Sequence, residues 1–440
     1  MNLTADKGTI RHDCNQVTMI RTPALKNGHI FEKFFIAYPE VHSHKGRDIS
    51  ELLLKVCLEQ LNLPLEEFRL RFTGGTFDGQ YIHLNVMTHL SEMLHLPDDF
   101  LEDAILWDAA HRLELASDDA KKEKKDKRGN TTIKPAPWLQ ELDSVLQHIM
   151  TKFRYGKNHS DLCQIAKEMH LTFLEFCLFS STRFIEYVYR TYDHFVRMAP
   201  VLYEKLKRDE SNADTQKESD NLEELEKLLV QAKTVTDLLF MKEVSHFLIL
   251  CSRSFQKLDT PPFEPMYKLN QLKDSIEKAK RSFQDGKVPD SIEIVFPDSH
   301  TYTAWDFFKS SVQDICESQT FKGIPLLVPG HRGRVTHSGV QYGYDKEAFS
   351  SLVKSRYQHY AGYLGELLAS LQQRFEPWPE WVPFCDDAFN FAKDMTMEER
   401  QASLKSLLDC PFGPNRFVEE EKNKDFGRIC YISIKCREGS

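Results

Sequence analysis

The feature that most constrains the fold of this chain is a change in the spacing of its apolar residues near residue 138. Before that point, short β-branched and aromatic segments alternate with segments of helical spacing, an order typical of α/β proteins. After it, apolar residues recur at helical spacing as far as about residue 375, which predicts a long series of amphipathic helices. We therefore expect two kinds of architecture in one chain.

The first part of the chain predicts a hairpin followed by alternating helices and strands. Residues 16–25 and 29–41 are rich in β-branched and aromatic side chains, and the Asn27-Gly28 pair between them is a hairpin-turn signal. The elements expected after the hairpin are a helix capped by Asp48 or Ser50 and running to about Leu61, a strand at 69–72 ended by Gly74-Gly75, a helix at 86–94, a strand at 104–107 and a helix at 109–116.

Composition divides the chain into four expected regions. Residues 1–118 form the α/β part, and 119–137, a run dominated by Lys and Asp, is expected to be an exposed charged linker. Residues 138–375 form the helical block, whose aromatic stripes we interpret as core packing. Residues 376–440 are rich in Pro and Trp, and the alternating segment at 428–436 predicts one strand that returns to the α/β part.

Net charge excludes one class of function for the chain as a whole. The sequence has 57 Lys and Arg against 66 Asp and Glu, a net charge of −9, so any nucleic-acid surface must be a local patch. No apolar run approaches the roughly 18 residues that span a bilayer. Residues 1–7 lack the apolar core of a secretory signal. We therefore expect no membrane partner and a nuclear or cytoplasmic, not secreted, protein.

The cysteines predict no metal site. Ten are scattered along the chain without a CxxC pair, whereas zinc sites need closely spaced ligand pairs. Only His12 with Cys14, and Cys430 with Cys436, come near that spacing. We interpret the thiols as reduced and mostly buried.

Acidic residues and one histidine lie near the ends of expected strands. They are Asp6, Asp78, Asp108 and His111. Carboxylates from neighbouring strands can converge on two Mg²⁺ ions, which activate a water and stabilise the leaving oxygen of a phosphodiester. Asp6 and Asp78 are therefore candidate catalytic and metal-binding residues. The alternatives are a turn residue for Asp78 and a structural helix histidine for His111.

The order of these segments resembles the ribonuclease-H-like core of hAT-superfamily transposases and of host proteins derived from them. The segments that carry the resemblance are Asp6 with the hairpin, 47–54, 73–79, 107–115 and the helical block opened by Trp138. The resemblance implies an α/β ribonuclease-H-like core with a mixed sheet, interrupted by a large all-α insertion domain. It also implies that the family's first catalytic Asp is Asp6, on the opening strand, and that its second is Asp78, at the start of an Asp-Gly element.

The chain departs from the family pattern at several points. The Cys-x-x-His element of the family reads Asp108-Ala-Ala-His111, so only His111 matches it. The late catalytic Glu has no match, because Glu380, which precedes a Trp, lies between Pro379 and Pro383, and prolines disfavour a helix there. The zinc-binding finger and the C-terminal dimerisation segment of the family are also missing, so the chain resembles the middle of a transposase.

Three functions agree with these residues. The first is a domesticated or degenerate hAT-type protein without transposition activity, which requires no cofactor and binds DNA or protein partners. The second is an active Mg²⁺-dependent nuclease or transposase that uses Asp6, Asp78 and an unidentified late Glu. The third is a helical scaffold for protein interactions.

Two short basic groups are candidates for a nucleic-acid patch. Cations would contact the phosphate backbone, and an aromatic ring between them could stack on bases. The alternative is a set of unrelated surface charges. The candidate residues are Lys152, Arg154, Tyr155 and Lys157 in one group, and Arg332 and Arg334 in the other.

Overall fold

The computed structural model of the chain contains two compact units. The sheet unit includes Met1–Arg112 and part of 255–269, and the helical unit includes Leu113–Ser254 and Asn270–Arg374. The boundaries of the four regions expected from the sequence are not tested by this division and remain predictions. The structure describes all residues except 11–12, 27–28, 73, 78–80, 82, 97–104, 108, 122–123, 126–130, 134–135, 177–184, 257–263, 296–300, 329–345 and 377–440.

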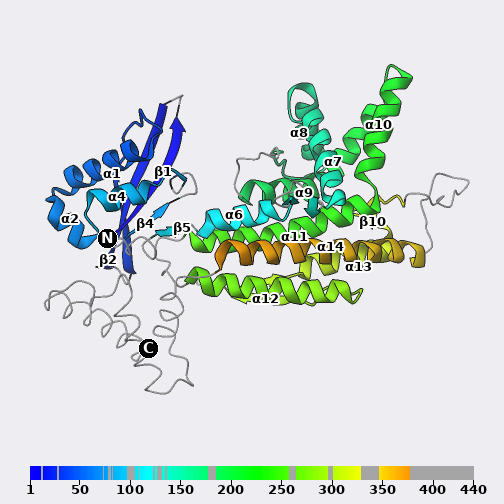
Figure 1. Cartoon of the computed structure of the whole chain (residues 1–440). Coiled ribbons are helices and arrows are strands. Elements are labelled where there is room, and N and C mark those ends of the chain that lie inside the picture. Colours follow the sequence, from blue (N-terminus) through cyan, green and yellow to red (C-terminus); the bar gives the residue numbers. More distant parts are fainter. Residues whose placement is uncertain are drawn as a thin grey trace, which may run out of the picture. The chain divides into compact units, whose positions relative to one another are not determined.

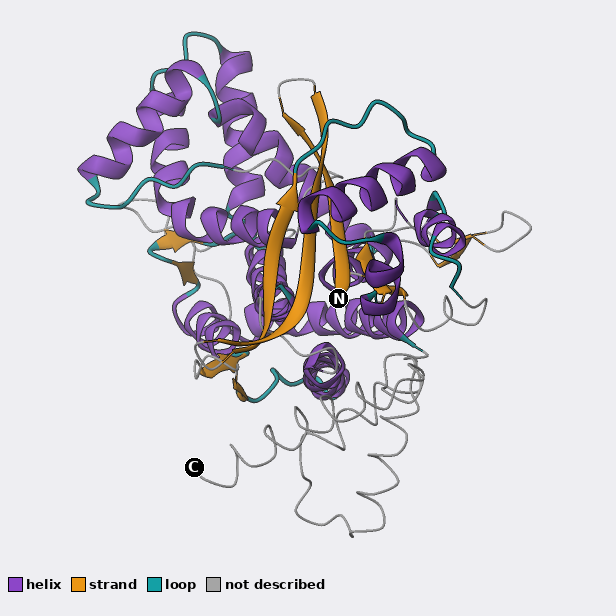
Figure 2. Ribbon diagram, turned by 90° about the vertical axis from the view of Figure 1, so that its left-hand side faces the viewer, coloured by secondary structure: helices purple, strands orange, loops and turns teal. Residues whose placement is uncertain are grey.

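The sheet unit is built on a five-stranded mixed sheet (Figures 1 and 2). Its strand order is β3-β2-β1-β4-β5. The first three strands pair antiparallel, whereas β4 pairs parallel to β1 and to β5. The expected hairpin is confirmed by the β2–β3 pair, whose last described register pair is Lys26 with His29. The strands are β1 (Asn2–Ile10), β2 (Asp13–Lys26), β3 (His29–Ala37), β4 (Gly74–Phe77) and β5 (Ile105–Trp107).

Three helices form a hydrophobic core with the sheet. They are α1 (Gly46–Leu61), α2 (Leu65–Arg71) and α4 (Val86–Met93). The helices expected at 48–61 and 86–94 are therefore confirmed, as is the strand expected at 104–107. Residues buried in this core come from all of these elements, and they include Leu3, Ala5, Ile20, Ile49, Leu53, Phe68, Phe77, Val86 and Leu90.

The strand expected at 69–72 is wrong, because these residues end helix α2 and the turn after it. Phe68 and Phe72 are both buried and stack with ring centroids 5.8 Å apart, a helical i, i+4 contact. The glycine pair expected to end a strand instead begins β4. Gly74 has φ 128°, a backbone conformation that favours glycine, and a Cβ on Gly75 would lie 2.1 Å from the buried Phe77 ring.

The start of α1 also differs from the expected caps. The N-cap residue is Lys45, which makes no side-chain cap hydrogen bond. Asp48 accepts a hydrogen bond from the Ser43 hydroxyl at 2.5 Å, and the buried Ser50 hydroxyl donates to the Val86 carbonyl at 2.9 Å. These serine and aspartate side chains therefore hold α1 to its surroundings, and Ser50 ties it to α4.

The helical unit is mostly α-helical, as expected for this part of the chain. Two short antiparallel hairpins interrupt the helices, which the all-α prediction missed: β8 (Ile292–Val295) with β9 (Thr301–Ala304), and β10 (Thr320–Phe321) with β11 (Ile324–Pro325). The helices that contribute to the unit are α6 (Ala109–Asp119), α7 (Pro137–Phe153), α8 (Gly156–Glu168), α9 (Ile185–Ser211), α10 (Gln216–Leu229), α11 (Ala232–Phe255), α12 (Glu264–Gln284), α13 (Asp306–Ser318) and α14 (Lys346–Phe375). No helix in the described ranges is both long enough and apolar enough to cross a bilayer.

The segment expected as a charged linker contains regular structure where it is described. Helix α6 extends as far as Asp119, and a short antiparallel pair follows it, formed by β6 (Lys124–Lys125) and β7 (Thr131–Ile133). The next helix, α7, begins at Pro137, and proline at the first helical position is well tolerated because its missing N–H has no partner there.

An aromatic cluster confirms that the stripes of the helical block are core packing. Phe240 of α11 lies at its centre and stacks on Tyr360 of α14 with ring centroids 4.0 Å apart. Trp138 of α7 and Phe283 of α12 make edge contacts with Phe240, and Trp305 is tilted by 31° against the Phe240 ring; all five residues are buried. Helices α11, α12 and α14 therefore run side by side (Figure 1).

Candidate functional site

The position of Asp6 is set by the pairing of β1 with both of its neighbours. In the backbone register Asp6 lies opposite Val17 of β2, and the preceding residue, Ala5, pairs with Phe77 at the end of β4. In the sequence Asp6 follows Ala5 and Asp78 follows Phe77. The structure therefore brings the strand that carries Asp6 beside the strand that precedes Asp78, although 63 residues separate β1 from β4.

Two of the four predicted residues at the strand ends lie outside the described residues. They are Asp78 and Asp108, which follow β4 and β5 in the sequence. His111 lies in the first turn of α6 and is half-buried. Among the described residues no group of three or more His, Cys, Asp and Glu side chains could hold a metal ion. The carboxylates of Asp6 and Asp78 are not among the side chains that the structure describes.

The two rows of residues on the central strands differ in burial. Leu3 and Ala5 of β1, with Thr18 and Ile20 opposite them on β2, are all buried. The alternate row is half-buried and contains Thr4, Val17, Met19 and Thr76. Alternate residues of a strand point to opposite faces of the sheet. The face that carries Thr4 and Val17 is therefore the more accessible of the two.

Two buried polar residues flank the register position of Asp6, and sequence analysis did not single them out. Gln16 and Thr18 are fully buried. The Tyr81 hydroxyl donates to Gln16 Oε1 at 3.2 Å, but Gln16 Nε2 and Thr18 Oγ1 make no hydrogen bond to any described residue. A buried polar atom that lacks any partner costs about 1–3 kcal/mol.

The first predicted basic group does come together, at the corner between α7 and α8. Lys152 lies in the last turn of α7, Arg154 and Tyr155 join the helices, and Lys157 lies in the first turn of α8. The Tyr155 ring is 69% exposed, and the Arg154 guanidinium carbon lies 5.1 Å from its centroid. Asn158 donates to the Lys152 carbonyl at 3.0 Å and fixes the corner. Arg332 and Arg334 lie outside the described residues.

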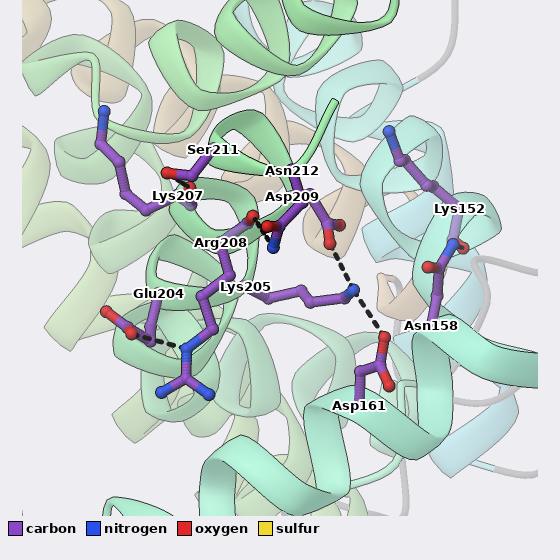
Figure 3. A network of polar contacts seen from close by, with 10 residues as sticks. All are labelled: Lys152, Asn158, Asp161, Glu204, Lys205, Lys207, Arg208, Asp209, Ser211 and Asn212. Carbon is purple, nitrogen blue, oxygen red and sulfur yellow. Dashed lines mark hydrogen bonds and ion pairs between the residues drawn. The ribbon is translucent and has the colours of Figure 1, made fainter. Parts of the chain in front are cut away.

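Carboxylates from other helices reduce the positive charge of this corner. Burial lowers the pKa of Lys152, and the charges of Asp209 and Glu218 partly offset this. In Figure 3 the Lys205 ammonium lies between two carboxylates, 2.7 Å from Asp161 and 2.5 Å from Asp209. Burial favours a lower pKa for Lys205, but these hydrogen bonds raise it overall. The positive charge of the corner is therefore partly offset by carboxylates of neighbouring helices.

A second group of cations lies on helices α9 and α11, and sequence analysis did not identify it. We call it the cationic strip, and it consists of Arg190, Arg197, Lys242, Arg253 and Lys322. The first two lie on α9, the next two on α11, and Lys322 lies in the turn between β10 and β11. Ion pairs through Glu186 and Asp193 connect the two helices. The repeat of basic residues seven positions apart on α9 was the signal available in the sequence.

Comparison with protein-family models, with curated proteins and with solved structures finds no match for this chain. Its function must therefore be inferred from its own residues. The two features that bear on function are the pairing of β1 with β4 in the sheet unit and the cationic strip in the helical unit.

Proposed function

We propose that this chain is a ribonuclease-H-like protein derived from an hAT-type transposase, and that it does not transpose DNA. The observation that carries the proposal is the parallel pairing of β1 with β4, with Ala5 opposite Phe77. The resemblance requires one acid on the opening strand and a second acid in an Asp-Gly element, and convergence of the two requires adjacent strands. Adjacency of strands so far apart in sequence is specific support for that arrangement.

The donor set fits a magnesium ion. Mg²⁺ is usually bound by one or two carboxylates together with waters, and Asp6 and Asp78 would supply two carboxylates. The bound ion would act as a Lewis acid on a phosphodiester. The two aspartates would position the ion, but orientation of the attacking water and stabilisation of the leaving oxygen usually need a further acid. The sequence offers no matching late Glu, so we propose binding of the ion without strand transfer.

The test combines metal binding with cleavage. Binding of Mn²⁺ as a probe for Mg²⁺ is measured by electron paramagnetic resonance for the full chain and for the variants Asp6→Asn and Asp78→Asn. We expect each variant to bind the ion at least about tenfold more weakly, because each removes one of two carboxylate ligands. Glu59→Gln is the matched control, since Glu59 is exposed on α1 and makes only a 3.9 Å contact with Lys55.

Two outcomes would contradict this proposal. Equal Mn²⁺ affinity in the wild type and both variants would show that the two carboxylates do not converge. Mg²⁺-dependent cleavage of labelled DNA that disappears in either variant would favour the active nuclease, and it would require a third acid that we have not assigned.

A further inference from the structure

The cationic strip carries more positive than negative charge. Glu186 Oε1 lies 2.5 Å from Arg190 and 3.3 Å from Arg253. Asp193 lies 3.8 Å from Arg197 through one carboxylate oxygen and 3.6 Å from Lys242 through the other. Two carboxylates of α9 are therefore shared among four cations, and the buried Glu243 adds a third negative charge near Lys242. Such a shared arrangement leaves an excess of positive charge at the surface.

Lys322 adds a fifth cation without adding a carboxylate. It forms no ion pair with any residue in the described part of the chain. Burial lowers the pKa of Lys322, and the nearby charges of Lys242 and Arg197 lower it further, although the charge of Asp193 opposes this. Lys322 and Gly323 have φ of 51° and 82° in the tight turn between β10 and β11. The fold thus holds three cations near the single carboxylate of Asp193, and a bound anion would reduce their repulsion.

Aromatic rings form a rigid base beneath these charges. The Lys242 ammonium lies 3.4 Å from the centroid of the Phe307 ring, a close cation–π contact. His246, one turn further along α11, stacks on Tyr189 with centroids 4.8 Å apart and meets the Tyr302 ring edge-on at 4.5 Å. The position of the Lys242 ammonium is therefore set by packing, which lowers the entropic cost of binding a ligand at this end of the strip.

The strip is longer than a single phosphate group. Its ion pairs join Lys242 to Asp193 at one end and Arg253 to Glu186 at the other. Between these ends α11 advances about 16 Å and α9 about 10 Å, at a rise of about 1.5 Å per residue. Cations spaced over this distance can contact consecutive phosphates of a nucleic-acid strand as well as one free phosphate.

We propose that the cationic strip is a phosphate-binding surface, whose ligand is either the backbone of a nucleic acid or inorganic phosphate. The guanidinium groups of Arg190, Arg197 and Arg253 match the geometry of phosphate oxygens, and the two lysines supply point charges. The inference goes beyond the proposed function, because the strip lies in the helical unit and uses neither Asp6 nor Asp78.

The first arm of the test measures binding of a fluorescein-labelled 20-nucleotide DNA, single-stranded and duplex, by fluorescence anisotropy across a range of salt concentrations. EDTA is present throughout, so the result is independent of the metal site proposed for the sheet unit. We expect the double variant Arg197→Gln/Lys322→Gln to bind roughly tenfold more weakly and to reduce the salt-dependence slope by about 1.4 for single strands and about 1.8 for duplex. The matched control is Arg154→Gln/Lys157→Gln, which removes two cations from the α7–α8 corner.

The second arm measures the shift in thermal unfolding caused by inorganic phosphate against chloride at equal ionic strength. Stabilisation by phosphate that the strip variant loses identifies a free phosphate as the ligand, and DNA binding alone identifies the nucleic-acid backbone. Both results support the surface. Absence of both DNA binding at low salt and stabilisation by phosphate would overturn it. So would an equal loss of binding in the control variant, or no loss in the strip variant when circular dichroism shows that all variants fold.

Discussion

The sheet unit and the helical unit differ in the kind of buried polar group that each contains. In the helical unit, the buried Asp237 accepts two hydrogen bonds from the Arg356 guanidinium, at 2.9 and 2.6 Å, and a third from Tyr360 at 2.8 Å. In the sheet unit, the buried Gln16 Nε2 and Thr18 Oγ1 have no hydrogen-bond partner among the described residues. Gln231 Oε1 and Trp305 Nε1 of the helical unit also lack a partner among the described residues, so the contrast lies in the buried carboxylate: Asp237 is held by three hydrogen bonds, which fix its packing.

Glu243 shows the same pattern as Asp237. It is almost completely buried on α11, and its Oε1 accepts hydrogen bonds from the Tyr302 hydroxyl at 2.6 Å and from the Trp305 backbone N–H at 2.9 Å. Burial raises the pKa of Glu243. These bonds fix the hairpin β8–β9 and the start of α13 against α11, which is a structural role for a charged residue.

The strongest way to break the helical unit is to remove one partner of its buried ion pair. Asp237→Ala leaves the Arg356 guanidinium uncompensated, so we expect the free energy of unfolding to fall by about 3–5 kcal/mol. Urea unfolding followed by tryptophan fluorescence measures the change. The double variant Asp237→Leu/Arg356→Met is the control and should recover most of the loss, because it leaves no unpaired charge. A loss below about 1 kcal/mol for Asp237→Ala would mean that the pair is not desolvated.

In the sheet unit, we expect the largest loss of stability from a substitution of Gly46. A Cβ at Gly46, in the first turn of α1, would lie 1.7 Å from the backbone carbonyl oxygen of Leu84. Gly46→Ala must therefore push α1 away from the segment before α4, and we expect a destabilisation of about 1–3 kcal/mol. Gly362→Ala on α14 meets nothing within 4 Å and is the matched control. Equal stability of the two variants in urea unfolding would contradict the close approach of α1 to Leu84.

The pH dependence of the helical unit should include the titration of His246. Burial, with the charges of Lys242 and Arg253, lowers the pKa of His246 to about 4, although Asp193 opposes this. The unfolded chain binds a proton near pH 6.5 and the folded chain does not, so stability is present above that pH and is lost as the pH falls from 6.5 to 4. We expect His246→Gln to reduce the loss of unfolding free energy over this pH range by about 2 kcal/mol. Thermal unfolding measured at pH 7 and pH 4.5 gives the comparison, and an unchanged slope would contradict it.

The smallest expected effect concerns the buried Thr18 hydroxyl in the sheet unit. Thr18→Val keeps the shape of the side chain and removes an oxygen that lacks a described partner, so we expect a gain of about 1 kcal/mol. Thr236→Val on α11 is the control, because that buried hydroxyl donates to the Ala232 carbonyl at 2.7 Å and its loss should not stabilise. A destabilised Thr18→Val would show that the hydroxyl is satisfied.

Local signals in the sequence predicted most of the elements. The Asn27-Gly28 pair between two β-rich runs predicted the β2–β3 hairpin, because a hairpin depends on neighbouring residues. Helical spacing predicted α4 and the aromatic stripes around Phe240. The residues before Gly74 were misassigned, because a short apolar run fits a strand and a helix equally well and only the packing of Phe68 on Phe72 decides between them.

The candidate sites depended on distance in space, which the sequence did not reveal. Lys152 and its neighbours look basic along the chain, but Asp209 and Glu218 come from other helices and balance them. The cationic strip could not be predicted from the sequence, because its residues are far apart along the chain. Lys242 and Lys322 approach each other only when α11 packs beside the β10–β11 turn.

The sequence by itself determined the β2–β3 hairpin, the helices α1 and α4, the change to helices near Trp138 and the aromatic character of the helical core. Only the tertiary structure decided that β1 lies beside β4, and which charges are balanced and which are in excess. The physical reason is range: hydrophobic periodicity and turn preference act between neighbours in the chain, whereas strand pairing and Coulomb interactions depend on distances that only folding sets.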